Sequence, residues 1–323
     1  MSINCFTERV NEFAHKAKPF FFVIDFEKKN PLVYTLEQAA NKNVFFDIGG
    51  QKNFQQFSQT NKRFEIIPKT IIEDRYKRAF EQVQEHIIKG DSYLLNLTFP
   101  SEVFFKGTLK ELFLASKSPY KLFFKNQFVS YSPECFVKIM GDEIFSYPMK
   151  GTVSATLPNA EELLLKNHKE IAEHATIVDL IRNDLSLYAK KVRVNRFRYL
   201  HRIVTQQEDL FQVSSEIQGE LRNDWRSNLG NIIWDMLPAG SVSGAPKTKT
   251  LEIIESVEES PRGYYTGVYG FFDGQNLDSA VAIRFLEQYN GNYFYRSGGG
   301  VTAQSNCEEE YQELLDKIYV PTF

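Results

Sequence analysis

The chain has 323 residues, and its 38 Lys and Arg against 41 Asp and Glu give a formal net charge of −3. Its 42% hydrophobic residues are typical of a globular protein with a sizeable core. The charge balance argues against a nucleic-acid binder that relies on a basic surface. No apolar run approaches the roughly 18 residues that span a bilayer, and no signal peptide is visible. We therefore expect a cytoplasmic protein without a membrane or nucleic-acid partner.

Cysteine and histidine usage also narrows the class of protein. Cys5, Cys135 and Cys307 are widely separated, and the five histidines include no HExxH motif. Neither a disulfide scaffold nor a structural zinc site is indicated.

The first 69 residues contain few features that suggest a catalytic or binding role. Thr70 and Glu73 then have the spacing of a capping box, which predicts a helix that ends at Gly90. Alternating apolar patterns predict strands on either side of this helix, with a Gly141-Asp142 turn before the last of them. The predicted strands are Phe20–Ile24, Asn43–Ile48, Tyr93–Phe99, Lys121–Tyr131, Cys135–Met140 and Glu143–Tyr147.

Three further helices are predicted in the C-terminal half. A capping box of Asn159 and Glu162 opens a long helix that ends near Asp184. Pro246 suits the first position of a helix that runs from Lys247 to about Val257. The last helix begins at a third capping box and ends near Ile318; the box is formed by Ser305 and Glu308.

Between the last two helices, the segment from Tyr264 to Gly300 predicts a meander of three strands, with turns at Asp273-Gly274 and Asn290-Gly291. Helices mixed with adjacent hairpins favour an α+β fold over a doubly wound parallel sheet. No linker is evident, so a single domain over residues 1–323 is predicted.

Five segments place polar residues and glycines inside core-like patterns. They are Ser132–Phe136, Tyr147–Thr152, Ala172–Asp184, Leu237–Lys247 and Arg296–Lys317. Each has an ordinary interpretation when taken alone. Lys150 has the pattern of a solvated surface lysine, and Glu134 that of an exposed turn carboxylate. The functional alternative for Lys150 is a lysine at the exit from a strand into a loop, where a substrate can approach Gly151 closely.

Two of these segments contain carboxylates that need a partner for their negative charge. Glu173 lies on or beside the buried face of its helix, where a carboxylate needs a cation, a hydrogen-bond donor or a metal. Glu310, Glu313 and Lys317 share one face of the last helix. Ordinary salt bridges remain the alternative for both groups.

Two further features could hold an anion. The backbone N–H groups of Gly298, Gly299 and Gly300 are free of side chains, as in an anion-binding nest. Arg284 is predicted on a strand from Ser279 to Leu286, beside small apolar neighbours, where it would seek a carboxylate.

Together, in this order, the five segments resemble the chorismate-utilising enzymes, which include anthranilate, aminodeoxychorismate, isochorismate and salicylate synthases. The resemblance covers roughly Thr70 to Val320, and residues 1–69 match it weakly. It implies antiparallel sheets packed orthogonally face to face, with helices outside. Lys150 in Pro148-Met149-Lys150-Gly151-Thr152 resembles the aminodeoxychorismate synthase branch, since other branches usually have a small residue there.

The resemblance implies a role for each matching residue. Lys150 would attack the C2 atom of chorismate, and Glu134 would protonate the departing C4 hydroxyl. Because an ammonium cannot attack, Lys150 is expected to be largely neutral. His201 and Thr152 match groups near the ring and its leaving hydroxyl.

The same resemblance implies how the substrate is bound. Glu173, Glu310 and Glu313 would hold Mg²⁺, a hard cation that prefers oxygen ligands. Tyr265 and Arg284 would bind the enolpyruvyl carboxylate of the substrate. The full binding set is Tyr265, Arg284, Ser241, Gly298, Gly299, Gly300 and Lys317.

Departures and alternatives remain. Leu94 stands where many relatives of this branch have glutamine, and Ser241 where relatives often have threonine. The expected activity is that of aminodeoxychorismate synthase component I, with ammonia from a separate glutamine amidotransferase subunit. An anthranilate or isochorismate synthase activity and a non-catalytic chorismate-binding paralogue are the alternatives.

Overall fold

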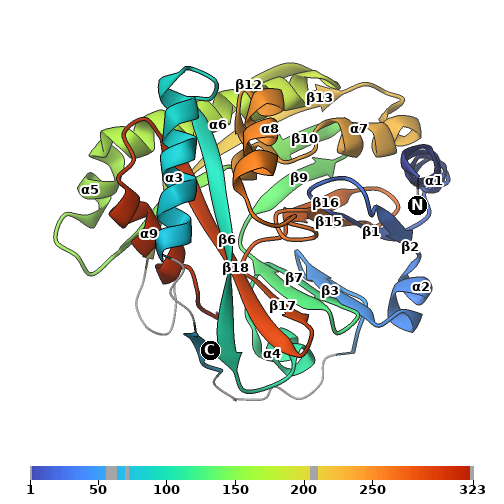
Figure 1. Ribbon diagram of the computed structural model, residues 1–323. Coiled ribbons are helices and arrows are strands. Elements are labelled where there is room, and N and C mark those ends of the chain that lie inside the picture. The colour runs from blue at the N-terminus through green and yellow to red at the C-terminus, as the bar shows by residue number, and fades with distance from the viewer. Residues whose placement is uncertain (1, 56–63, 70–72, 204–209, 321–323) are drawn as a thin grey trace.

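A computed structural model describes residues 2–55, 64–69, 73–203 and 210–320. Its helices alternate with antiparallel strands along the chain (Figure 1). The helices are α1 (Ile3–His15), α2 (Leu36–Asn41), α3 (Glu73–Ile88), α4 (Leu109–Ala115), α5 (Ala160–Lys166), α6 (His168–Ser186), α7 (Leu229–Asp235), α8 (Lys247–Val257) and α9 (Cys307–Asp316), with 3₁₀ turns η1 (Trp225–Asn228) and η2 (Gly240–Val242). No described helix is both long enough and apolar enough to cross a membrane.

The described strands form two antiparallel sheets, which confirms the predicted α+β class. The first sheet has the order β11-β13-β10-β9-β16-β15-β1-β2, with β12 beside β13, and its strands are β1 (Phe20–Ile24), β2 (Leu32–Tyr34), β9 (Cys135–Met140), β10 (Glu143–Ser146), β11 (Met149–Ser154), β12 (Ala189–Ile203), β13 (Leu210–Leu221), β15 (Val268–Phe272) and β16 (Leu277–Val281). The second has the order β14-β6-β18-β17-β8-β7-β3-β4, with β5 beside β6, and its strands are β3 (Val44–Ile48), β4 (Gln51–Lys52), β5 (Ile66–Pro68), β6 (Leu94–Phe105), β7 (Tyr120–Phe124), β8 (Phe128–Ser132), β14 (Gly244–Ala245), β17 (Phe285–Tyr289) and β18 (Asn292–Thr302).

The two sheets pack face to face through aromatic side chains. Phe21 of β1 stacks on Phe46 of β3, with ring centroids 4.9 Å apart, and Phe271 of β15 contacts the same ring. In Figure 1 the long strands β6 and β18 cross the direction of β15 and β16. Because side chains alternate along a strand, Phe20 and Phe22 of β1 instead face a second core, on the other side of the first sheet.

Helices cover the outer faces of both sheets (Figure 1). Helices α1, α6 and α7 pack on the first sheet, and α3, α8 and α9 pack on β6 and β18 of the second. Helix α4 closes the remaining outer face of the second sheet. The first 69 residues supply strands to both sheets, and the prediction of a single domain stays a prediction.

Several predicted strand boundaries are wrong. The predicted strand Lys121–Tyr131 is a hairpin of β7 and β8, because Lys125 and Asn126 adopt left-handed backbone angles that make a tight turn. The predicted meander holds four strands rather than three. Its turns at Asp273-Gly274 and Asn290-Gly291 are confirmed, but the chain passes from one sheet to the other at Arg284.

The predicted helix starts are also corrected. Asn159 precedes α5 in a left-handed conformation and its side chain caps nothing, whereas Asn167 ends α5 and caps α6 by accepting from the Glu170 N–H. The predicted long helix is therefore two helices. Asn306, rather than Ser305, caps α9, and Pro246 is the N-cap of α8 rather than its first residue. Thr70, half of the first predicted capping box, lies outside the described residues.

Candidate active site

Lys150 lies on β11 at the edge of the first sheet and forms an ion pair with Glu173 of α6. The Lys150 Nζ is 2.5 Å from a Glu173 carboxylate oxygen, and the two side chains are only 20% and 6% exposed. The strand is irregular between Lys150 and Thr152, where its pairing register with β13 shifts. Gly151 has a φ of 68°, in the region that favours glycine. Lys150 is therefore neither an ordinary strand lysine nor a solvated one.

The charge state of Lys150 differs from the sequence expectation. Burial alone would lower its pKa, but the paired Glu173 and the more distant Glu170 and Glu313 outweigh burial, so the pKa is raised above that of an ordinary lysine. The expectation of a largely neutral amine is wrong for this structure. An attack by Nζ requires that the ammonium first lose a proton, and the Glu173 carboxylate is within hydrogen-bonding distance.

Glu134 accepts a short hydrogen bond from the hydroxyl of Ser241, which lies on η2. Burial raises the pKa of Glu134 above its ordinary value, although that hydrogen bond and the charges of Lys150, Arg284 and Lys317 act in the opposite direction. A carboxyl with a raised pKa is suited to donate a proton to a leaving group. The three cations that act on Glu134 come from β11, the β16–β17 crossover and the end of α9, so these segments meet around it.

The glycines of β18 bring three carboxylates together. A Cβ atom on Gly300 would lie 2.0 Å from a Glu173 oxygen, and one on Gly299 would lie 3.3 Å from Glu310 and 3.8 Å from Glu313. Side chains at these positions would displace the carboxylates. Glu173, Glu310 and Glu313, which come from α6 and α9, therefore converge on one stretch of bare backbone.

The chemistry of these carboxylates suits Mg²⁺, but two of them are already paired with lysines. Glu173 binds Lys150, and Glu313 lies 2.7 Å from Lys317. In the described part of the chain no three Asp, Glu, His or Cys side chains form a preassembled metal cluster. The oxygen donors fit a hard cation, and their lysine pairs would have to open to admit one.

Lys317 contacts the glycine segment of β18. Its Nζ donates to the carbonyl oxygen of Gly298 at 2.7 Å and also contacts Glu313. The ammonium is therefore held at the edge of β18, where a substrate carboxylate is expected.

Arg284 and Tyr265 sit close to the crossover between the sheets. Arg284 has a φ of 51°, a left-handed conformation that costs a non-glycine residue energy and is often found at functional sites. Tyr265 is buried against Phe285, and burial raises its pKa to about 12, so its hydroxyl stays a hydrogen-bond donor. The predicted strand through Arg284 is wrong, and the crossover presents the guanidinium instead.

His201 lies on β12 beside the edge of the first sheet. It pairs with Gln212 of β13, and Gln212 pairs with Thr152 of β11, so the three residues share one rung. The His201 ring is exposed and contacts Tyr199. The side chain of Thr152 is outside the described part of the structure, so its predicted role stays a prediction.

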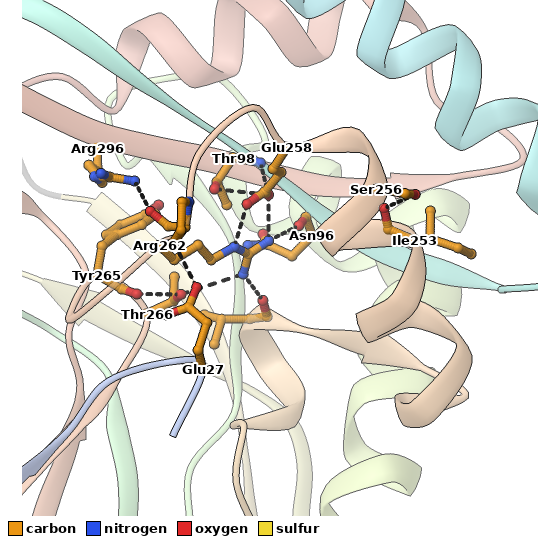
Figure 2. Close-up of polar contacts among 12 residues, drawn as sticks. Glu27, Asn96, Thr98, Ile253, Ser256, Glu258, Arg262, Tyr265, Thr266 and Arg296 are labelled. Carbon is orange, nitrogen blue, oxygen red and sulfur yellow. Dashed lines mark hydrogen bonds and ion pairs between the residues drawn. The ribbon is translucent and has the colours of Figure 1, made fainter. Parts of the chain in front are cut away.

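Arg262 joins the segments that carry this site (Figure 2). Its guanidinium is 1% exposed, and its five N–H groups have acceptors in Glu258, Thr266 and the carbonyl oxygens of Val242 and Asn96. Val242 follows Ser241, Thr266 follows Tyr265, and Asn96 pairs with Gly300. Arg262 thus fixes three predicted binding segments relative to one another.

Three residues of this site, Arg262, Glu170 and Tyr319, were not among those predicted from the sequence. Glu170 lies one helical turn before Glu173, and one of its oxygens would be 3.2 Å from a Cβ on Gly151. The i, i+3 spacing of these two glutamates could have indicated it. Nothing in the sequence pattern indicated Tyr319, which contacts Arg284, because their positions depend on how the sheets and α9 pack.

Sequence comparison gives relatives along the whole chain. Residues 5–322 match the family described as chorismate binding enzyme. The "uncharacterized PabA-like protein" of Pasteurella multocida is 50% identical over 322 residues, which are 99% of this chain and 99% of that protein. Aminodeoxychorismate synthase component 1 of Bacillus subtilis is 33% identical over 76% of this chain, which spans only 54% of that enzyme.

Solved structures give the same fold. A putative 2,3-dihydroxybenzoate-specific isochorismate synthase of Bacillus anthracis matches with a TM-score of 0.73 at 23% identity, over 98% of this chain and 88% of that one. Anthranilate synthase component I of Streptococcus pneumoniae matches with a TM-score of 0.65 at 24% identity, over 81% and 60%. With the family match over nearly its full length, the chain belongs to the chorismate-binding enzymes, which convert chorismate.

Proposed function

We propose that this protein is an aminodeoxychorismate synthase component I, which replaces the C4 hydroxyl of chorismate with an amine. The observation that carries the proposal is Lys150, a half-buried amine on an irregular edge strand that is paired with Glu173 and acts electrostatically on Glu134. Relatives of 33% and 31% identity named aminodeoxychorismate synthase component 1 support it. The product would serve p-aminobenzoate and folate synthesis in the cytoplasm.

The first step joins Lys150 to the substrate. After its proton has left, Nζ attacks C2, the two conjugated ring double bonds shift from C1=C2 and C5=C6 to C1=C6 and C4=C5, and the C4–O bond breaks. Glu134 donates its proton to the departing oxygen, so that water leaves. The raised pKa of Glu134 favours the protonated acid that this step needs.

The second step reverses the same shift. Ammonia attacks C4, both ring double bonds shift back to C1=C2 and C5=C6, and the C2–Nζ bond breaks, which returns the electron pair to Lys150. Two allylic displacements thus replace one difficult direct substitution. We propose that a separate glutamine amidotransferase subunit supplies the ammonia.

The substrate carboxylates would be held at two places. Lys317 and the N–H groups of the Gly298–Gly300 segment would bind the ring carboxylate, and Tyr265 and Arg284 the enolpyruvyl carboxylate. Glu173, Glu310 and Glu313 would hold Mg²⁺, which, when bound, supplies positive charge against the ring carboxylate. The ion pairs of Lys150 and Lys317 would then exchange partners as substrate binds.

Anthranilate synthase is the second candidate, because a component 1 of that enzyme from Haloarcula marismortui is 34% identical over 73% of this chain. That reaction has no use for Lys150 as a nucleophile. The two candidates therefore differ in what the loss of this amine does.

Incubation with chorismate, Mg²⁺ and an ammonium salt, followed by mass spectrometry of the products, tests the proposal. We expect aminodeoxychorismate from the wild type and none from Lys150→Ala. Lys89→Ala, at the exposed residue that follows α3, is the control and should leave the product unchanged. Anthranilate or isochorismate as the main product, formed equally by Lys150→Ala, would overturn the proposal.

A magnesium titration tests the carboxylate assignment separately. Glu313→Gln removes one of the three proposed ligand charges, so the Mg²⁺ concentration for half-maximal turnover should rise by at least about tenfold, the effect of a lost metal interaction. Glu309→Gln, on the exposed side of the same helix, is the matched control. An unchanged titration for Glu313→Gln would contradict the proposed metal site.

A further inference from the structure

Tyr319 contacts Arg284, at the crossover between the sheets, and also two tyrosines of the second sheet. Its hydroxyl accepts a hydrogen bond from the Arg284 Nε at 3.2 Å, and its ring lies 5.0 Å from the guanidinium carbon. Its backbone carbonyl accepts from the hydroxyls of Tyr295 at 2.9 Å and Tyr131 at 3.4 Å. The main chain and the side chain of Tyr319 are therefore both fixed.

The anchors of Tyr319 are rigid. Tyr131 and Tyr295 are almost fully buried on β8 and β18, and Ile318 is inserted into the core between β6, β8 and α4. Because both tyrosines belong to central strands of the second sheet, the position of residue 319 is set by the sheet and not by the free end of the chain. Tyr319 itself is 46% exposed, so one side of it faces solvent.

The contact to Nε leaves the other end of the guanidinium open. In the described part of the chain the two terminal nitrogens of Arg284 donate to no protein group. Those two nitrogens form the fork that binds a carboxylate in a bidentate manner. An arginine side chain has several rotatable bonds, so an acceptor on Nε and a ring against the guanidinium reduce the freedom that is lost on binding.

The short segment from Lys317 to Tyr319 also links the two proposed carboxylate sites. Lys317 contacts Gly298 at the end of α9, and two residues later Tyr319 contacts Arg284. The chain turns between them, with the Tyr319 N–H bonded to the Lys317 carbonyl. This compact turn holds the two cations at a set separation, as recognition of a dicarboxylate requires.

We propose that Tyr319 is a positioning residue that orients Arg284 for the enolpyruvyl carboxylate of the substrate. The inference rests on the proposed assignment of Arg284 to that carboxylate. Tyr319 acts through Arg284, away from the reacting C2 and C4 atoms. It therefore contributes to substrate binding and to selection of ligands that carry a side-chain carboxylate, and not to the chemical step.

Two ligand analogues separate positioning from general stability. 3-(Carboxymethoxy)benzoate carries both carboxylates, and 3-methoxybenzoate lacks the one assigned to Arg284. By titration calorimetry, Tyr319→Phe should weaken the first about fivefold, the ratio expected from one net hydrogen bond, and leave the second within about twofold. Tyr319→Leu, which also removes the ring, should weaken the first by more than about tenfold.

Steady-state kinetics should show the same effect as a change in KM without a change in kcat. For Tyr319→Phe we expect the KM for chorismate to rise by the same factor of about five, with kcat within about twofold of wild type. Tyr289→Phe, at the exposed end of β17, is the matched control and should change neither ligand affinity nor KM. A similar loss of affinity for both analogues would mean a structural role, and unchanged affinity for both would mean no role; each overturns the proposal.

The same experiments distinguish a failure of the proposed amination from a failure of the proposed role of Tyr319. A wild-type protein that binds chorismate and the dicarboxylate, shows the selective loss in Tyr319→Phe and forms no aminodeoxychorismate would leave the positioning role intact and refute the amination. A wild type that binds 3-methoxybenzoate as tightly as 3-(carboxymethoxy)benzoate would refute the Arg284 assignment and the role of Tyr319 with it.

Discussion

Glu134 is the residue at which the opposing electrostatic effects of this site are clearest. Burial raises its pKa, while the Ser241 hydroxyl and the surrounding cations favour the charged carboxylate. A proton donor needs the acid form, so activity that depends on Glu134 should fall as the pH rises through its raised pKa. The hydrogen bond from Ser241 lowers the pKa of Glu134 and so limits how far burial raises the pH at which activity falls.

Replacement of Ser241 by alanine tests this relation. The hydroxyl stabilises the charged carboxylate, so its loss raises the pKa of Glu134 further and moves the alkaline fall of kcat/KM to higher pH. The measurement is a pH–rate profile with chorismate, and Ser256→Ala, at the exposed side of α8, is the control. A fall that stays in place, or moves to lower pH, would contradict the assignment of Glu134 as the acid.

At the residue level, the sequence led to Lys150, Glu134 and the glutamates through motif order, and the structure brings these side chains together. The charge state of Lys150 could not be inferred, since it depends on the distance to Glu173, a residue of another element. The contact between Tyr319 and Arg284 could not be inferred for the same reason.

Among the elements, β18 shows why glycine is needed where strand and site coincide. A methyl group at Gly300 would overlap the Glu173 carboxylate, whereas one at Gly299 would only press on Glu310. Because the overlapped atoms belong to the end of a side chain, we expect Gly300→Ala to fold, with Glu173 pushed away from Lys150.

We therefore predict that Gly300→Ala lowers kcat/KM by about 10²-fold, the effect of a displacement of about 1 Å in a catalytic group. Gly299→Ala should have a smaller effect, because its nearest contact is longer. Steady-state kinetics measure kcat/KM for both variants, and thermal unfolding curves check that both are folded. Equal kcat/KM for the two variants would show that the clash with Glu173 does not matter.

Arg262 connects the loops that carry Val242 and Thr266 to strand β6 through the hydrogen bonds of its guanidinium. Its partner Glu258 is 5% exposed and accepts from both Arg262 and Thr98, so loss of the arginine leaves a buried charge unpaired. Arg262→Met should lower the free energy of unfolding by about 3–5 kcal/mol, and a second change, Glu258→Leu, should restore part of it. Urea unfolding measures both.

The neighbouring pair of Arg75 and Glu259 is the control for that prediction. Its side chains are 46% and 47% exposed, so Arg75→Met should cost no more than about 1 kcal/mol. A loss for Arg262→Met as small as that for Arg75→Met would show that the buried network does not hold these loops.

Element boundaries were predicted well where one local signal decides them. The helix from Lys247 to Val257 and the strand from Cys135 to Met140 have the predicted bounds. The hairpin within Lys121–Tyr131 was missed because its turn residues, Lys125 and Asn126, lack the glycine that marks such turns. The crossover at Arg284 was missed because an apolar run continues through it.

For the molecule as a whole, the two-sheet arrangement explains how distant segments form one site. Lys150 belongs to the first sheet, Gly298–Gly300 to the second, and Glu173 to a helix on the first sheet. Local periodicity predicts each element but not which elements meet, because the packing of sheets depends on contacts between residues far apart in sequence. The family resemblance supplied that information before the structure did.

The covalent step at Lys150 is the central claim, and intact-protein mass spectrometry tests it most directly. Chorismate and Mg²⁺ without ammonia should leave Lys150 bonded to the ring, since the second displacement lacks its nucleophile. We predict that the protein gains the mass of chorismate less one water, that peptide mapping places the gain on Lys150, and that ammonium discharges it. Turnover of chorismate to aminodeoxychorismate by Lys150→Ala, or an adduct that ammonium cannot discharge, would contradict the account.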